Sequence, residues 1–350
     1  MDPETALGLV KHGATLLLLG VPQYTLVGID TQTHILYWTS FQRIYYSSSN
    51  REGNEFSPII SFFIDAIPSQ VIVRKWDQEE EHFVKLCEEE EQRYSDAVRR
   101  LEFDKNLVLY TLTHYGEWKC LSNYITRNTI ELIEPVGGEI SIACESEMSK
   151  NTKFSKPKEK PQTRGCYYTL IPRVVKHKGM HIEDLTIMNI DKTQLLESIL
   201  TAAYEGDEDS LLGELQFTFV AFLMGQSPEA FLQWKLLIEP LHTRSRLFKK
   251  FIQVIYHQLK YGFKNDRKDT SAADKGVAAL LDESWLSSDC LLHRLCKDFF
   301  PLVQEAPVID GGLLIWTRKL KELLEDSFGD CTNDVPCDFY EKMDFAVYMK

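Results

Sequence analysis

The most continuous hydrophobic pattern in the chain lies at residues 217–224, where only Thr218 is polar. A helix over these residues has no face left for water, so it must lie in the middle of its domain. Asp209 and Ser210 can cap its start, and Gly225 is placed to end it. The pattern therefore predicts a core helix.

Two further helices are predicted directly after the core helix. Ser227 followed by Pro228 is typical of a helix start, with a capping hydroxyl and a proline in the first turn. The face of this second helix is made by Phe231, Trp234, Leu237 and Ile238. The third helix, roughly residues 245–259, has an apolar stripe made by Phe248, Ile252, Ile255, Tyr256 and Leu259. A helical hairpin closed by a third helix is expected.

The amino-terminal part has the residue alternation and the turn residues of β-strands. Strand-like segments lie at residues 13–19, 24–30, 35–46, 59–66 and 70–76. Helical periods are expected at 77–102 and 117–127, and a last strand at 140–144. These segments predict a β-rich, sandwich-like domain that carries one or two helices.

Residues 149–164 interrupt both patterns with five Lys and one Arg against one Glu, a local charge of +5. So few apolar residues predict a flexible linker, although the charge would also allow contact with RNA. An all-α domain of about seven helices is expected after it. Its helices are predicted to open at 191–194 and to continue at 272–281, 289–300 and 313–325.

The chain is therefore expected to be an α+β multidomain protein with four parts. These are a β-rich domain at residues 1–148, a basic flexible linker with an extended connector at 149–185, an all-α domain at 186–329 and an acidic, aromatic tail at 330–350.

The net charge of -13 argues against a general nucleic-acid binder, which needs clustered Lys and Arg to neutralise phosphates. The eight cysteines are scattered without a CxxC pair, as is typical of reduced thiols inside a cell. The longest early apolar run, residues 14–19, is far too short to span a membrane. We expect a soluble protein with protein partners, and neither nucleic acid, membrane nor a small-molecule substrate.

The sequence contains no convincing catalytic or metal-binding constellation. His177 and His181 have the spacing of a metal-binding pair, but no acidic or cysteine partner stands at ligand spacing. Cys290 and His293 share one predicted helix without a third group to orient them. The acidic run at 88–91 is interpreted as a solvated helix face. We therefore expect no enzyme activity, no metal and no cofactor.

Two sequences in and after the core helix resemble those of a known family. They are Leu-Gly-Glu-Leu-Gln-Phe-x-Phe-Val-x-Phe-Leu at residues 212–223 and Glu-Ala-Phe-x-x-Trp-Lys at 229–235, which are similar to the AAR-two splicing-factor family. Residues 13–30 and 62–76 also look like its amino-terminal domain. The chain departs from the family at 33–46, where a Gly- and Pro-rich segment is usual and neither residue occurs.

The resemblance implies a non-enzymatic assembly factor for the spliceosomal U-five snRNP in pre-mRNA splicing. Members of the family bind the Prp-eight scaffold protein through its RNase H-like and endonuclease-like domains, in the precursor particle before the Brr-two helicase joins. It also implies a location in cytoplasm and nucleus. The alternatives are a general α-helical scaffold or adaptor for another complex, and a hydrolase whose site the sequence does not reveal.

The resemblance also implies a role for the tail, because family members use a tail that adds a strand to the partner's sheet. Phe345, Val347 and Tyr348 are β-favouring residues in a segment with no core of its own. We expect them to contact the partner.

The turn between the second and third predicted helices is a second candidate contact. His242, Arg244 and Arg246 are expected at its exposed surface, with Thr243 and Ser245 able to cap the next helix. Phosphorylation of Thr243 or Ser245 would add negative charge beside two arginines, so the turn could also act as a switch. Plain capping and regulation both remain open.

Overall fold

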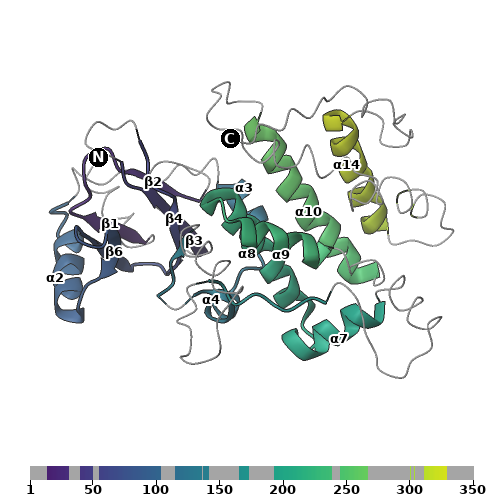
Figure 1. Cartoon of the computed structure of the whole chain (residues 1–350), viewed down its shortest axis with the longest axis horizontal. Coiled ribbons are helices and arrows are strands. Elements are labelled where there is room, and N and C mark those ends of the chain that lie inside the picture. The colour runs from purple at the N-terminus through teal and green to yellow at the C-terminus, as the bar shows by residue number, and fades with distance from the viewer. Residues whose placement is uncertain are drawn as a thin grey trace, which may run out of the picture. The chain divides into compact units, whose positions relative to one another are not determined.

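The computed structural model describes residues 14–30, 40–49, 55–103, 115–135, 137–141, 165–172, 193–238, 245–266, 300, 303 and 311–328 (Figure 1). The chain divides into two compact units, Met1–Gln258 and Leu259–Lys350. The first unit joins the β-rich part to the predicted core helix. The domain boundaries expected at residues 148, 185 and 329 stay predictions.

One sheet has four antiparallel strands in the order β2, β3, β4, β7. These are β2 (Leu26–Ile29), β3 (Ser40–Ser47), β4 (Ile60–Ala66) and β7 (Ile140–Ser141). Ile44 of β3 lies opposite Ile29 of β2 and Phe62 of β4, and all three side chains are buried. Because alternate residues of a strand share a face, this register builds one side of the core.

A second sheet has three strands in the order β1, β5, β6. They are β1 (Thr15–Leu19), β5 (Val71–Asp77) and β6 (His82–Lys85). β1 and β5 are parallel, whereas β5 and β6 are antiparallel. The two sheets confirm the β-rich amino-terminal part.

The helical period expected from residue 77 is wrong for residues 77–87. This stretch contains the end of β5 and then β6. Phe83 is buried, with its ring centroid 4.8 Å from that of Tyr46 and 5.1 Å from that of Trp76. The spacing of Phe83 from Cys87 fits a helix by coincidence. Burial in this aromatic cluster decides the local structure instead.

Three short helices follow in the β-rich part: α2 (Glu88–Arg99), α3 (Tyr115–Ser122) and α4 (Arg127–Ile133). α4 adds a helix to those expected, and Thr126 caps it by accepting from the Thr129 backbone N–H. Glu88 and Glu89 are exposed in the first turn of α2, where the helix dipole favours negative charge.

The helical part contains α7 (Thr193–Tyr204), α8 (Glu208–Gly225), α9 (Pro228–Ile238) and α10 (Ser245–Asp266). The core helix is confirmed as α8, because every residue from 211 to 222 is buried. Asp207 caps α8 instead of Asp209 or Ser210, and the left-handed residue after it is Gln226 instead of Gly225. α10 runs seven residues beyond the predicted end at 259.

In the second unit, α14 (Gly311–Phe328) matches the helix expected at 313–325. Leu313, Leu320 and Leu324 are buried on it. The helices predicted at 272–281 and 289–300 lie outside the described residues, apart from Phe300. A β-rich amino-terminal part and a helical carboxy-terminal part are thus both present. None of the described helices is both long and apolar enough to cross a membrane.

Candidate interaction surface

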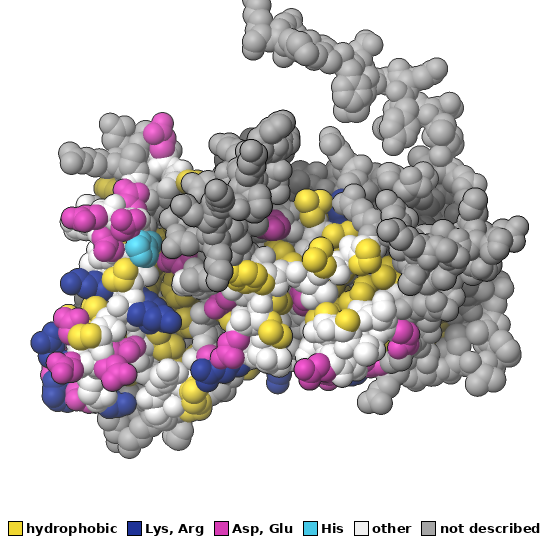
Figure 2. Space-filling model, turned by 60° about the horizontal axis from the view of Figure 1, so that its bottom comes forward, with side chains coloured by type: hydrophobic (Ala, Val, Ile, Leu, Met, Phe, Trp, Pro, Cys, Tyr) yellow, Lys and Arg dark blue, Asp and Glu magenta, His cyan; other side chains and the backbone are white. Residues whose placement is uncertain are grey.

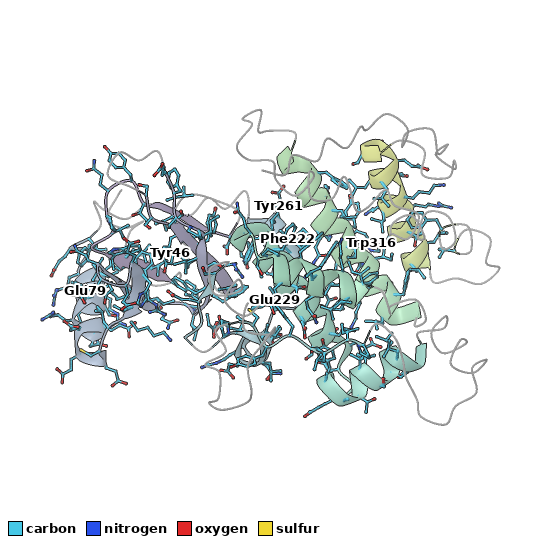
Figure 3. The ribbon with its side chains drawn as sticks, in the orientation of Figure 1. Tyr46, Glu79, Phe222, Glu229, Tyr261 and Trp316 are labelled. Atoms are coloured by element: carbon cyan, nitrogen blue, oxygen red, sulfur yellow. The ribbon has the colours of Figure 1, made fainter. Side chains whose placement is uncertain are left out.

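α8 packs through aromatic side chains on its neighbours. Phe222, labelled in Figure 3, has its ring centroid 4.6 Å from that of Phe231 on α9. Phe219 lies 5.8 Å from Trp234 on the same helix. Two long polar side chains of α8, directly before the apolar run, are nevertheless buried: Glu214 is 2% exposed and Gln216 is fully buried. Both need hydrogen-bond partners, because an unpaired buried polar group is costly.

The Glu214 carboxylate accepts four hydrogen bonds from three segments. The Thr169 backbone N–H and hydroxyl donate to it at 2.9 and 2.7 Å, the Tyr204 hydroxyl at 2.7 Å and Gln233 Nε2 at 3.0 Å. Burial and the charge of Glu214 raise the pKa of Tyr204, which therefore remains a donor. One carboxylate thus fixes α7, α9 and the segment around Thr169 to α8.

Gln216 ties α8 to the turn between α3 and α4. Its Nε2 donates to Cys120 O at 3.2 Å and to Asn123 Oδ1 at 2.8 Å, and its Oε1 accepts from the Tyr124 backbone N–H at 2.7 Å. A Cβ on Gly213 would lie only 2.6 Å from Tyr124 O. The backbone of the turn therefore approaches the helix where a glycine allows it.

Residues 165–172 form an extended segment, here called the connector segment, that runs over these helices. The Tyr167 backbone N–H donates to Ile133 O at 2.8 Å, and Gln233 Nε2 donates to Thr169 O at 2.8 Å. The Tyr168 ring packs edge-on against Phe217, with centroids 6.4 Å apart. With the bonds to Glu214, these contacts hold the segment in one position.

Four large apolar side chains are exposed on the connector segment and on the two helices, α4 and α9, that hold it, and we call this set the connector strip. They are Leu132 at 58%, Tyr167 at 48%, Leu170 at 94% and Leu232 at 53% exposure. Leu132 directly precedes Ile133, whose carbonyl accepts from Tyr167. Leu232 directly precedes Gln233, whose side chain donates to Thr169 O. Figure 2 shows hydrophobic side chains among charged ones on one face of the molecule. Apolar groups held in place at a surface are typical of protein contacts.

A second exposed set, the β2–β3 patch, consists of Tyr24, Leu26 and Phe56. Ser49 brings them together, because its hydroxyl donates to Tyr24 O at 2.9 Å and its backbone forms a β-bridge with Phe56. Leu26 of β2 pairs with Ser47 of β3, which lies two residues before Ser49. The described residues therefore carry at least these two sets of exposed apolar side chains, and Ile67 and Ile315 are exposed as well.

The predicted contact residues are not tested by the structure. The tail residues Phe345, Val347 and Tyr348 and the turn residues His242, Thr243 and Arg244 lie outside the described residues. Ser245 and Arg246 begin α10, but their side chains are not described. The recognition tail and the switch turn stay predictions.

The residues considered for chemistry are placed only in part. His177, His181, Cys290 and His293 lie outside the described residues. Among the residues that the structure describes, no group of three His, Cys, Asp or Glu side chains could hold a metal ion.

Sequence reasoning missed the connector strip and the network that holds it. The available signal was the presence of Glu214 and Gln216 directly before the apolar run at 217–224. A polar side chain in a fully buried helix must find partners, so it marks where other segments cross that helix. The partners themselves come from distant parts of the chain and leave no local pattern.

Comparison with known proteins finds matches to one family in both parts of the chain. The family model for the AAR2 N-terminal domain matches residues 12–135, and that for the AAR2 C-terminal repeat region matches residues 168–330. The whole basic segment at 149–164 therefore falls between the two matches.

Curated relatives agree over most of their length. A protein AAR2 homolog of Caenorhabditis elegans is 30% identical over 302 residues, 74% of this chain and 82% of the relative. The protein AAR2 homolog of Homo sapiens is 25% identical over 309 residues, and that of Mus musculus 24% over 306. Each of these two covers 74% of this chain and 78% of the relative.

Proposed function

The chain belongs to the AAR2 family, which supports a splicing-related role, and we propose that it is a non-enzymatic assembly factor for the spliceosomal U-five snRNP. In this role it binds the Prp-eight scaffold protein, through the RNase H-like and endonuclease-like domains of that partner. It holds the scaffold in the precursor particle before the Brr-two helicase joins. The protein would act in cytoplasm and nucleus.

The observation that carries this proposal is the match of both family models, in order, across the two parts of the chain. The relatives are named as protein homologs and not as enzymes, which is consistent with an assembly role. The net charge of -13 also suits a partner whose own surface binds RNA and is therefore basic. Such a protein can block RNA from the scaffold without binding RNA itself.

Direct binding tests the proposal. The purified full-length chain is mixed with the isolated RNase H-like domain of the scaffold, and the complex is followed by calorimetry at two salt concentrations. We expect a one-to-one complex whose affinity falls as salt rises, because complementary charge contributes to it. If the chain forms no complex at low salt with this domain, and none with the endonuclease-like domain, the proposal is wrong.

The connector strip and the β2–β3 patch are the candidate contact surfaces on the described residues. The double variant Leu170→Ser, Leu232→Ser is compared with the matched double variant Tyr24→Ser, Phe56→Ser, since all four side chains are exposed. If the scaffold contacts the strip, the first variant loses at least tenfold in affinity and the second loses little. The reverse result assigns the contact to the β2–β3 patch.

The tail and the turn before α10 are further proposed contacts. Deleting residues 335–350, which removes Phe345, Val347 and Tyr348, should weaken scaffold binding without lowering the melting temperature. Glutamate at Thr243 or Ser245 should also weaken binding, whereas alanine should retain it with a capping loss of about 1 kcal/mol at most. His242, Arg244 and Arg246 are the neighbouring contacts that the added charge would change.

The competing function is a general α-helical scaffold or adaptor for another complex. A pull-down from nuclear and cytoplasmic extracts separates the two. Recovery of U-five proteins without the mature tri-snRNP supports assembly, whereas recovery of an unrelated complex without Prp-eight supports the adaptor.

A further inference from the structure

The C-terminal half of α8 contacts the four-stranded sheet through a chain of ring and charge contacts. The rings of Phe217 on α8 and Phe63 on β4 stack with centroids 4.8 Å apart. The Arg43 guanidinium of β3 lies 4.9 Å from the centroid of the Phe63 ring. These three residues and Gly225, the last residue of α8, make up the α8 seat.

The α8 seat buries a positive charge at the end of a helix. Arg43 is fully buried, and its Nη2 donates to the Ser61 hydroxyl. A Cβ on Gly225 would lie 2.7 Å from this Nη2, so the guanidinium touches the last turn of α8. The helix dipole places negative partial charge at that end, which favours a cation there.

Glu134, the C-terminal cap of α4, is the acidic group beside the seat, because its carboxyl accepts from the Phe63 backbone N–H and is influenced by the charge of Arg43. Its Oε1 is shielded from solvent and has no hydrogen-bond partner among the described residues. Its Oε2 lies 3.4 Å from the position that a Cβ on Gly138 would take. The carboxyl is thus confined by backbone on one side and has one oxygen without compensation.

Four influences decide the charge of Glu134. Burial raises its pKa, whereas a hydrogen bond from the Phe63 backbone N–H and the positive charges of Arg43 on β3 and Lys85 on β6 lower it. Burial is the largest of these and brings the pKa of Glu134 to about 7. The ionised form is therefore poorly accommodated in the seat, although Arg43 is near.

We propose that the α8 seat is a proton-sensitive joint, in which neutral Glu134 lets α8 close firmly on β4 and ionised Glu134 loosens that contact. The joint exchanges one proton with solvent and forms no covalent bond. Because α8 also holds α7, α9 and the connector segment, its seat controls how firmly that whole group is attached to the sheet. The proposal concerns this chain alone and does not depend on the identity of its partner.

The direction with pH follows from the raised pKa. Below pH 4.5, the ordinary pKa of a glutamate, the carboxyl is mostly neutral in both the folded and the unfolded chain, and it costs little. As pH rises from 4.5 to about 7 the unfolded chain ionises first, so the folded state loses stability. Above about 7 the loss is complete and constant. Ordinary salt-bridged carboxylates behave in the opposite sense.

Hydrogen exchange on the full-length chain tests the joint. Opening constants of the amides in 60–66 and 217–225 are measured from pH 5.5 to 8.5 and corrected for the intrinsic exchange rate. We expect them to rise about tenfold or more over this range, and to stay flat in Glu134→Gln. Glu131→Gln is the matched control, because Glu131 lies on the same helix and is exposed in an ion pair with Arg127. It should behave as the unaltered chain does.

Two results would overturn the proposal. One is a Glu134→Gln protein that keeps the same rise in opening with pH. The other is an equal rise in the three-stranded sheet at 15–19 and 71–77, which would indicate global unfolding instead of a local joint. Carbon-13 titration of the Glu134 carboxyl supplies a separate measurement, for which a midpoint near 7 supports the joint and a midpoint below 5 contradicts it. Melting at pH 5.5 establishes that each variant is folded.

Discussion

Two buried carboxylates, Glu214 on α8 and Glu134 on α4, differ in how many hydrogen-bond donors surround them. In the N-terminal half, Glu214 is buried and accepts four hydrogen bonds from Thr169, Tyr204 and Gln233. Near the C-terminal end, Glu134 has a shielded oxygen without a partner on the described residues, and its pKa is raised to about 7. The first carboxylate has the donors that an ionised group needs, and the second does not.

This difference separates a carboxylate that fixes neighbouring segments from one that responds to pH. A buried charge with a complete set of donors fixes the groups around it, and removing it leaves those groups unpaired. A buried acid with an incomplete set can discharge by taking up a proton within the physiological range. The same helix therefore has one end suited to constant attachment and one end suited to change. Four predictions test that contrast.

The largest expected effect tests whether α8 is the buried core helix. Phe219→Asp places an unpaired carboxylate where the side chain is 1% exposed and removes the contact with Trp234. The free energy of unfolding should fall by more than about 4 kcal/mol in urea titration. Ala202→Asp, at an exposed site of α7, is the control and should change it little. An unchanged melting temperature for Phe219→Asp would mean that α8 is misplaced.

Removing the compensated carboxylate should be the next most damaging change. Glu214→Ala leaves the donors of Thr169, Tyr204 and Gln233 without their acceptor, so unfolding should become about 3 kcal/mol easier. Limited proteolysis should also begin within the connector segment, 165–172. Glu205→Ala, at an exposed site, is the control. A connector that resists protease in Glu214→Ala would show that other contacts position it.

Two glycines of α8 offer a matched pair of substitutions. A Cβ on Gly213 meets backbone, Tyr124 O at 2.6 Å, whereas one on Gly225 meets the end of a side chain, Arg43 Nη2 at 2.7 Å. Gly213→Ala should therefore cost about 1–3 kcal/mol and Gly225→Ala clearly less, since a side chain can shift more easily than backbone. Thermal melting of the two proteins measures this order. The opposite order would mean that the α8 seat is the more rigid end.

The smallest effect should be a gain in stability. Glu134→Gln retains an acceptor for the Phe63 N–H and removes the charge, so it should stabilise the fold at pH 8 by about 1 kcal/mol and have little effect at pH 4.5. Urea titration at the two pH values measures the difference. Asp77 and Asp207, whose pKa values are lowered by hydrogen bonds, contribute in the opposite sense and only at more acid pH. A loss of stability at pH 8 would show that the ionised form is compensated after all.

Much of the fold could be predicted from local patterns. The run at 217–224, apolar except for Thr218, identified α8, and Ser227 with Pro228 identified the start of α9, where Ser227 Oγ accepts from the Ala230 backbone N–H at 3.0 Å. Both signals are complete within a few residues. The cap at Asp207 was missed because Asp207, Asp209 and Ser210 can all cap a helix, and only the backbone conformation chooses among them.

The rest depends on contacts between distant residues. β6 was expected to be helical because Phe83 falls at helical spacing, but its ring completes a cluster with Tyr46 and Trp76. The connector strip is the extreme case, because Leu170 is an ordinary leucine in sequence and its exposure is decided by what holds Thr169. Tertiary partners of this kind leave no local period to detect.

The stacking of Phe63 on Phe217 also has a consequence for how the protein is made. The partner ring for β4 is encoded far downstream, so the face of β4 that receives α8 is synthesised long before α8 exists. At roughly 5–20 residues per second, the nascent chain waits on the order of ten seconds with that face uncovered. During this interval the early strands present unsatisfied apolar surface at the ribosome exit. The first unit therefore cannot be completed before α8 has been synthesised, and a chaperone that shields β4 until α8 emerges would raise the yield of folded protein.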